Sequence, residues 1–344
     1  MARTTVYNKV VEDGNYELVN EENKELLNEF VDYLHSIDRS DLTIKNYISD
    51  IKIFYIWNLE HNKNKFFVDF TKREMIKYQN YMLNDMGVSS NRIRRLRASI
   101  SSLSNFIESV LDDDFPNFRN IINKIPAPTK QEVREKTVLQ DEEAQKLLDF
   151  LVEKGEYQQA CVFALAWGSG SRKSELLRFK ISYFTDENVI YGSLYKTPEK
   201  MKTKGRGKLG KQIPRYVLKN KFKPYFDLWI EERKRLGVDE NIDDLFVVKK
   251  LEGWQPMKVS SLNYYAKLFS KHLNVDFYFH CLRHNFTTGL VKAGVPADVI
   301  KDIVGWSSLD MVNLYTDIEI DDRLGDFFDE DGIKEIEKKN LSDL

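Results

Sequence analysis

Residues 276–318 read DFYFHCLRHNFTTGLVKAGVPADVIKDIVGWSSLDMVNLYTDI, and this stretch decides which fold the sequence predicts. His280 and Arg283 are three residues apart, so on a helix their side chains share one face. The apolar residues that follow them recur at helical spacing. The sequence therefore predicts a helix that presents an imidazole and a guanidinium side by side.

A Gly-Val-Pro sequence at 294–296 ends that helix and begins another, because Gly favours helix ends and Pro favours the first helical turn. We expect short helices over 297–304 and 308–314. These helices would carry Trp306 and Tyr315 back over the first helix.

The residues upstream form two predicted domains, since 344 residues suffice for two hydrophobic cores. Amphipathic periodicity predicts four helices in the first domain and four in the body of the second. Those of the first domain are 21–35, 43–59, 71–85 and 92–111, and those of the second are 141–153, 157–167, 221–235 and 260–272, with strands at 188–194, 212–218 and 245–248. The predicted boundaries are an extension at 1–20, a helical domain at 21–115, a Pro-containing linker at 116–135, a second domain at 136–325 and an acidic tail at 326–344.

The composition, 42% hydrophobic and 31% charged, is typical of a soluble globular protein. No apolar run approaches the roughly 20 residues that span a bilayer, and the amino terminus lacks the apolar core of a secretion signal. We therefore expect a cytoplasmic protein without a membrane partner. Cys161 and Cys281 have no metal-type spacing, so we expect two reduced thiols, no disulfide, no metal site and no cofactor.

Charge is unevenly distributed along the chain. The formal net charge is only -2, but residues 1–30 and 319–344 together hold 17 acids and 7 bases. The remaining residues, 31–318, hold 37 acids and 45 bases. A basic body with acidic ends favours a phosphate-backbone partner.

Four arginines, Arg92, Arg94, Arg95 and Arg97, crowd the first turns of the helix predicted at 92–111. Cations are unfavourable there because the helix dipole is positive at its amino end. A solvated basic face is the alternative interpretation. We favour contacts between these arginines and DNA phosphates.

A second basic segment lies between the two predicted strands 188–194 and 212–218. From Lys196 to Arg215 there are eight bases and one acid, with glycines that favour a tight turn. The pattern predicts a hairpin whose basic tip approaches a phosphate backbone closely. Its candidate DNA-binding residues are Lys202, Arg206 and Lys208.

Gly and Ser at 168–171 end a buried helix, and Arg172 begins a new one with Glu175 three residues later. An ordinary Arg-Glu helix pair is one interpretation. An arginine held by a neighbouring carboxylate is also a rigid fork for an anion.

Together these residues predict metal-free attack on a phosphodiester. Tyr315 is the candidate nucleophile, which would form a phosphotyrosine that conserves the bond energy for rejoining. Arg172 and Arg283 would neutralise the non-bridging oxygens. His280 and a hairpin lysine would move protons, the lysine toward the departing 5′ oxygen, and Trp306 would donate its indole N–H to a phosphate oxygen.

The sequences GSRKSE, HCLRH and GWSSLDM, with Tyr315 after them, resemble the tyrosine recombinase (phage integrase) family over residues 20 to 320. The resemblance is to the two-domain Xer and Cre types. It implies a mainly α fold with a small antiparallel sheet: a four-helix, SAM-like core-binding domain followed by an α/β catalytic domain. It also implies site-specific cleavage and rejoining of double-stranded DNA through a 3′-phosphotyrosine, without metal or external energy, by a tetramer assembled on DNA from free monomers or dimers.

By that resemblance Arg172, His280, Arg283, Trp306 and Tyr315 are catalytic, and Glu175 supports Arg172. Trp306 occupies a position where most members of the family have His. The catalytic lysine is ambiguous among Lys202, Lys204 and Lys208, and we favour Lys204 because it precedes the turn glycine. The short segment before residue 21 favours recombination at simple core sites, in a protein that is nucleoid-associated or encoded by a phage or mobile element.

Two alternatives remain at this stage. A DNA-binding regulator, like a phage repressor, could keep the fold and the basic surfaces without strand exchange. A topoisomerase would share the chemistry without site preference. The acidic tail at 326–344 could dock on a neighbouring subunit as a helix or be a solvated end.

Overall fold

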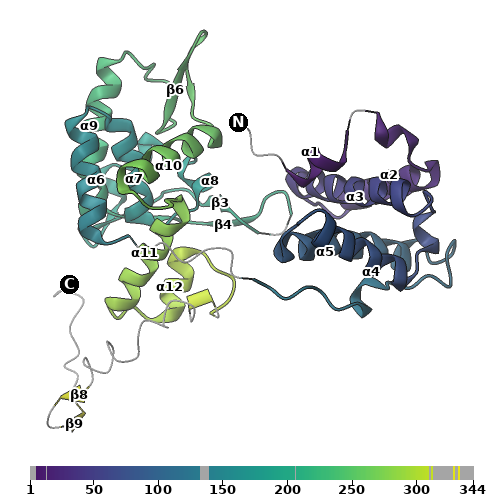
Figure 1. The fold of residues 1–344 in the computed structure, drawn as a ribbon. Helices are drawn as coiled ribbons and strands as arrows, with labels where there is room; N and C mark the ends of the chain where they lie inside the picture. The colour runs from purple at the N-terminus through teal and green to yellow at the C-terminus, as the bar shows by residue number, and fades with distance from the viewer. Residues whose placement is uncertain are drawn as a thin grey trace. The chain divides into compact units, whose positions relative to one another are not determined.

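The computed structural model describes residues 5–12, 14–131, 139–205, 207–309, 311–312, 328–329 and 332–333. The chain divides into two compact units, one made of residues 1–133 with 204–210 and the other of residues 134–203 with 211–344 (Figure 1). None of the helices in these described ranges combines the length and hydropathy needed to cross a membrane.

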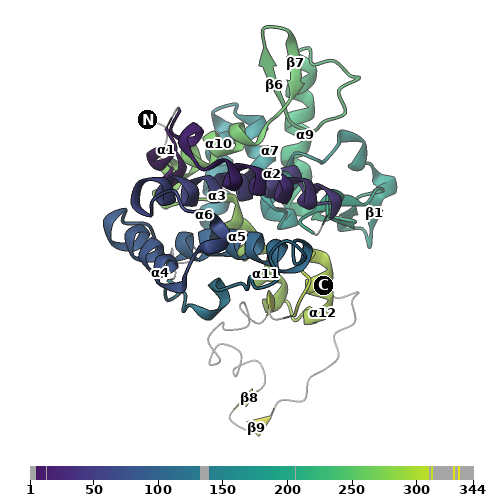
Figure 2. The same ribbon diagram turned by 90° about the vertical axis from the view of Figure 1, so that its right-hand side faces the viewer.

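The first unit is a helical bundle. Its helices are α1 (Val6–Val10), α2 (Glu21–Ser36), α3 (Asp41–His61), α4 (Lys72–Asn80), a π turn (Tyr81–Asp85) that continues α4, and α5 (Ser90–Val110). Within this unit α3 contacts both α2 and α5 (Figure 1; Figure 2). Their facing sides bury Phe30, Ile51, Phe54 and Leu96 completely. All four helices predicted for this domain are present.

Helix starts in the first unit follow from local capping. The Ser40 hydroxyl accepts the Thr43 N–H, and Thr71 and Glu74 form a reciprocal capping box at the start of α4. These bonds satisfy amide groups that the first turn leaves without helical partners.

The segment that follows α5 corrects the linker prediction in part. Asn120, Ile122 and Ile125 are buried against the first unit, around a short 3-10 turn at Ile122–Lys124. Residues up to 125 therefore contribute to the first core and do not behave as a free linker.

The second unit is built around α7 (Tyr157–Ser169), which is buried from Gln159 onward. A helix that is apolar on all sides requires partners on all sides. Its partners in this unit include α6 (Asp141–Glu153), α9 (Lys219–Arg235) and α11 (Phe279–Lys292). The remaining helices are α8 (Lys173–Leu176), α10 (Val259–Leu273) and α12 (Ala297–Val304). The helices predicted at 141–153, 157–167, 221–235, 260–272 and 297–304 are confirmed, whereas the one predicted at 308–314 lies partly outside the described residues.

Short antiparallel strands complete the second unit. They are β1 (Val189–Ile190), β2 (Leu194–Lys196), β3 (Met201–Thr203), β4 (Lys211–Ile213), β5 (Tyr216–Leu218), β6 (Val247–Lys250) and β7 (Gly253–Pro256), with β8 (Phe328–Asp329) and β9 (Gly332–Ile333) near the end of the chain. One sheet has the order β1-β2-β5, and the other strands pair as β3-β4, β6-β7 and β8-β9. The fold class is therefore as predicted, mainly α with small antiparallel sheets.

Two strand predictions were wrong in detail. The single strand predicted at 188–194 is a hairpin, because Tyr191 and Gly192 both have positive φ (50° and 70°) and turn the chain between β1 and β2. The strand predicted at 212–218 is two strands, with β4 pairing to β3 and β5 pairing to β2. The β3-β4 pair is the hairpin that the basic, Gly-containing segment predicted.

Candidate active site

The end of α7 places Arg172. Gly170 caps the helix in the left-handed conformation (φ 56°), which favours glycine. A Cβ atom at this position would also lie 2.5 Å from the Phe286 ring of α11. Glycine therefore allows the chain to turn tightly against α11 just before Arg172.

Arg172 and Glu175 form the predicted pair. Arg172 Nη1 donates to Glu175 Oε1 across 2.9 Å, and the Arg172 main-chain N–H donates to Oε2 across 3.0 Å. The carboxylate is 1% exposed and the Arg172 side chain 23%. Burial opposes ionisation of Glu175, but the positive charge of Arg215 and the bonds from Arg172 outweigh it, so the pKa of Glu175 is lowered. The Arg172 guanidinium is thus held by Glu175 and remains partly accessible to solvent.

Arg283 lies fully buried on α11. Its Nη1 donates to the Gly170 carbonyl (3.0 Å) and its Nη2 to the Val304 carbonyl (2.8 Å). The guanidinium carbon lies 5.5 Å from the centre of the Trp306 ring, within cation–π distance. Arg283 therefore joins the turn before Arg172, the end of α12 and Trp306 in one cluster.

His280 lies in the first turn of α11 and is exposed. Its ring contacts that of His284 edge-on, with centroids 4.8 Å apart. Partial desolvation, then the positive charges of Arg283 and Arg172, lower the pKa of His280. The structure therefore brings His280 into the electrostatic field of both arginines.

Sequence reasoning missed Arg215, which is fully buried in this cluster. Arg215 Nη2 is 3.6 Å from Glu175 Oε2 and donates to Ser171 Oγ across 3.1 Å. The available signal was alternation, since Ile213, Arg215 and Val217 are all buried while the residues between them are not. Arg215 lies at the inward-facing position just before β5, and a charged residue buried there needs a buried partner.

The candidate lysines lie in the β3-β4 hairpin. Lys202, Lys204 and Lys208 are exposed, and the last two fall in the segment 204–210 that groups with the first unit. Lys211, which the sequence did not single out, donates through Nζ to the Trp306 carbonyl across 3.4 Å. Tyr315 and Arg206 lie outside the described residues.

The arginines of α5 separate into two groups. Arg92 pairs with the buried carboxylate of Asp50 (2.7 Å), Arg95 lies 3.5 Å from it, and Arg94 is exposed. All three remain candidates for DNA contact.

Arg97 is more enclosed than the other three arginines of α5. It is 8% exposed and donates to the Gln79 side chain and to the carbonyls of Ile122 and Ile125. Its bonds fasten α4 and the segment 122–125 to α5, and its expected contact with DNA stays a prediction.

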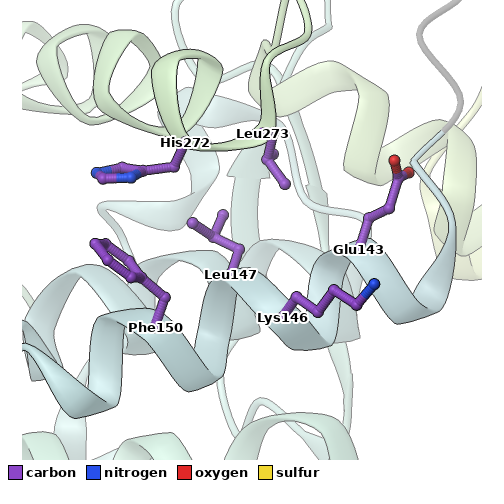
Figure 3. Close-up of a pocket in the computed structure, with 6 residues that line it drawn as sticks. All are labelled: Glu143, Lys146, Leu147, Phe150, His272 and Leu273. Carbon is purple, nitrogen blue, oxygen red and sulfur yellow. The ribbon is translucent and has the colours of Figure 1, made fainter.

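A cavity of about 340 Å³ is lined by residues of α6 and α10, among them Phe150 and His272, whose ring centroids are 4.3 Å apart (Figure 3). None of the candidate catalytic residues lines this cavity. The candidate active site is therefore the arginine cluster rather than this pocket.

Comparison with known proteins shows the family to which the chain belongs. Residues 137–321 match the phage integrase family, and residues 26–117 match the phage integrase N-terminal SAM-like domain. The chain belongs to the phage integrase family, the tyrosine recombinases. It is a DNA-binding enzyme of that class.

Among curated proteins, the chain is 32% identical over 226 residues to the SPbeta prophage-derived recombinase-like protein YomM of Bacillus subtilis (strain 168), covering 65% of this chain and 66% of that protein. It is 25% identical over 283 residues to tyrosine recombinase XerD of Staphylococcus haemolyticus (strain JCSC1435), covering 81% and 88%.

Solved structures support the fold. A XerH site-specific recombinase bound to difH substrate matches with a TM-score of 0.63 at 17% identity, over 91% of this chain and 97% of that one. A lambda integrase dimer bound to a core site matches with a TM-score of 0.61 at 16% identity, over 92% and 99%. At such identities the likeness concerns the fold.

Proposed function

We propose that the protein is a site-specific DNA recombinase that cleaves and rejoins strands through Tyr315. The observation that carries the proposal is the cluster in the second unit, where Arg172, Arg283, His280 and Trp306 meet with a buried carboxylate beneath them. The same order and spacing of residues predicted this site from sequence.

The reaction balances without an external energy source. The Tyr315 hydroxyl oxygen attacks phosphorus, a new P–O bond forms, and the bond between phosphorus and the 5′ oxygen breaks. The tyrosine proton passes to His280, and a lysine protonates the departing 5′ oxygen. The resulting 3′-phosphotyrosine has a bond energy close to that of the original phosphodiester, so a 5′ hydroxyl of a second strand reverses the step.

Charge stabilisation comes from the two arginines. Negative charge increases on the non-bridging oxygens as the phosphorus becomes five-coordinate, and preorganised cations in a desolvated site stabilise it strongly. Glu175 fixes the direction of Arg172, and the Gly170 and Val304 carbonyls fix that of Arg283. The Trp306 indole N–H would donate to the same phosphate.

Two basic surfaces would hold the duplex. One is the exposed side of α5 with Arg92, Arg94 and Arg95, and the other is the β3-β4 hairpin with Lys202, Lys204, Arg206 and Lys208. Such contacts position a protein on DNA without reading its sequence. We propose that four protomers assemble on paired sites, starting from free monomers or dimers. The division into a helical DNA-binding domain, predicted at 21–115 and joined by the packed segment up to 125, and a catalytic domain at 136–325 remains part of this proposal.

The test is strand exchange. The cognate site is first enriched from a genomic library by binding, and two plasmids that carry it are then incubated with the protein. We expect recombinant plasmids with wild type and none with Arg172→Ala or Tyr315→Phe. Tight site-specific binding without any recombinant product, indifferent to both substitutions, would favour the regulator instead. Relaxation of plasmids that lack the site would favour a topoisomerase.

A further inference from the structure

Arg215 is a buried arginine at the edge of β5 that the mechanism above does not use. We propose that Arg215 is a positioning residue, which holds Arg172 and Arg283 in fixed alignment for the transition state. This inference rests on the proposed function, because alignment matters only if both arginines act on one phosphate.

One edge of the Arg215 guanidinium holds the turn that carries Arg172. Nε and Nη2 both donate to Ser171 Oγ, across 3.3 Å and 3.1 Å, and Nη2 also donates to the Ser169 carbonyl across 3.5 Å. Ser169 and Ser171 are each 1% exposed, so water does not compete for these bonds. The residues on both sides of Gly170 are therefore fixed to Arg215.

The other edge holds the end of α12. Nη1 donates to the Val304 carbonyl (3.1 Å) and to the Ile303 carbonyl (3.3 Å). The Val304 carbonyl also accepts from Arg283 Nη2 across 2.8 Å. One oxygen thus ties Arg215 to Arg283, so any displacement of Arg215 displaces the acceptor on which Arg283 depends.

The carboxylate of Glu175 completes the link to Arg172. Its Oε1 accepts from Arg172, while its Oε2 lies 3.6 Å from Arg215. With a cation on each side the carboxylate is balanced between them. Without Arg215 the Glu175 carboxylate would be attracted to Arg172 alone, and the Arg172 guanidinium would change its direction.

Stabilisation of the folded state does not explain why an arginine occupies position 215. Burying an ion pair costs desolvation that the attraction between the charges often fails to offset, and apolar replacements are often as stable. Lysine keeps the charge but offers three donors at one point, whereas the planar guanidinium offers five. Only arginine can bridge Ser171, Val304 and Glu175 at once.

A second buried arginine in the same unit provides a matched control. Arg233 on α9 is 5% exposed and donates to the carbonyls of Ile242, Asp244 and Leu245. It contacts none of the candidate catalytic residues through these bonds. Arg233→Lys therefore reports the general effect of weakening a buried arginine.

The experiment compares wild type, Arg215→Lys, Arg233→Lys and Arg172→Ala in single-turnover cleavage of two matched DNA substrates. One has an ordinary scissile phosphate, and the other has an uncharged methylphosphonate, which lacks one of the oxygens that the arginines neutralise. A loss of structure slows both reactions alike. A loss of arginine alignment slows the phosphate reaction more.

We expect Arg215→Lys to lower the ratio of phosphate to methylphosphonate cleavage by roughly 10- to 100-fold, since small misplacements of catalytic groups cost about that much. Arg172→Ala sets the limiting ratio, and Arg233→Lys should leave the wild-type ratio unchanged. Ser171→Ala, which removes one acceptor of Arg215, should also lower the ratio, but by less than Arg215→Lys. If Arg215→Lys does not fold, the ratio in Ser171→Ala tests the inference in its place.

Equal ratios in Arg215→Lys and Arg233→Lys, or, where Arg215→Lys does not fold, a wild-type ratio in Ser171→Ala, would overturn the inference. Failure of the wild type to cleave the ordinary phosphate would be a different result, since it would refute the proposed function and the inference with it.

Discussion

Arg172 binds Glu175 through both its side chain and its main chain, with Nη1 2.9 Å from Oε1 and the main-chain nitrogen 3.0 Å from Oε2. A residue held at both ends has one side-chain direction available. This pair is local, three residues apart, and it sets the direction of the first catalytic arginine.

Glu175→Gln should therefore slow DNA cleavage by roughly 10- to 100-fold while leaving DNA binding close to that of wild type. The amide keeps the size of the side chain but has one oxygen, so it cannot accept both bonds from Arg172, and it no longer offsets the charge of Arg215. Single-turnover cleavage and binding titrations measure the two effects. Glu232→Gln, which breaks the surface pair with Arg235 on α9, is the control and should have no effect on cleavage. Unchanged cleavage in Glu175→Gln would contradict the assigned role.

Asp50→Asn tests whether the α5 arginines bind DNA. Asp50 is buried and holds Arg92 (2.7 Å) and the Ser99 hydroxyl (2.8 Å). Removing a negative charge should by itself tighten DNA binding. The substitution also removes the carboxylate that fixes the direction of the Arg92 side chain, and this loss should weaken DNA binding. We expect weaker binding, by about 3- to 10-fold, and a salt dependence smaller by about one phosphate contact.

The control for that prediction is Asp32→Asn, which removes an exposed acid of α2. It should leave DNA affinity unchanged or slightly increased. If Asp50→Asn binds DNA as tightly as Asp32→Asn, the α5 face does not contact the duplex in the way proposed.

The pH dependence of cleavage follows from His280. Desolvation and the two nearby arginines lower its pKa from 6.5, so its neutral form persists to lower pH than that of an ordinary histidine. A neutral imidazole can accept the tyrosine proton. We expect the cleavage rate to fall in acid with a midpoint below pH 6.5. His280→Asn should be slower and should lack this acid limb, whereas an acid limb with a midpoint above pH 6.5 in the wild type would contradict the assignment.

The candidate proton donors to the 5′ oxygen are Lys204, which the sequence favoured over Lys202 and Lys208, and Lys211, which donates to the Trp306 carbonyl. Replacing the bridging 5′ oxygen by sulfur creates a leaving group that needs no proton. The alanine variant of the true donor should cleave the ordinary substrate about 10²- to 10⁴-fold more slowly and should regain most of its rate on the sulfur substrate. We expect Lys204→Ala to regain its rate on the sulfur substrate. Lys211→Ala should show the same rate relative to wild type on the ordinary and the sulfur substrates. The reverse pattern would reassign the donor to Lys211.

Local sequence predicted the parts of the fold and the site that depend on neighbours along the chain. The pairing of Arg172 with Glu175, for example, involves residues three apart. The buried contacts of Arg97 could not be predicted because its partners, Ile122 and Ile125, lie some 25 residues away, and only packing brings them together.

Local sequence patterns also failed to predict the contacts of Arg215 and the turn at Tyr191. Arg215 meets Val304 across 89 residues, and no periodicity encodes such a contact. The strand predicted at 188–194 failed because Tyr191 adopts a positive φ, which residues other than glycine rarely do.

The central claim is that Tyr315, one of 17 tyrosines in the chain, attacks the phosphate. The most direct measurement uses a cognate duplex nicked just 3′ of the cleavage point, so that the released fragment diffuses away and the covalent intermediate accumulates. Protease digestion and mass spectrometry then identify the residue that bears the nucleotide. The account predicts a single adduct on Tyr315 that disappears in Tyr315→Phe and remains in Tyr264→Phe, which alters an exposed tyrosine of α10. An adduct on another residue, or strand exchange that continues in Tyr315→Phe, would contradict it.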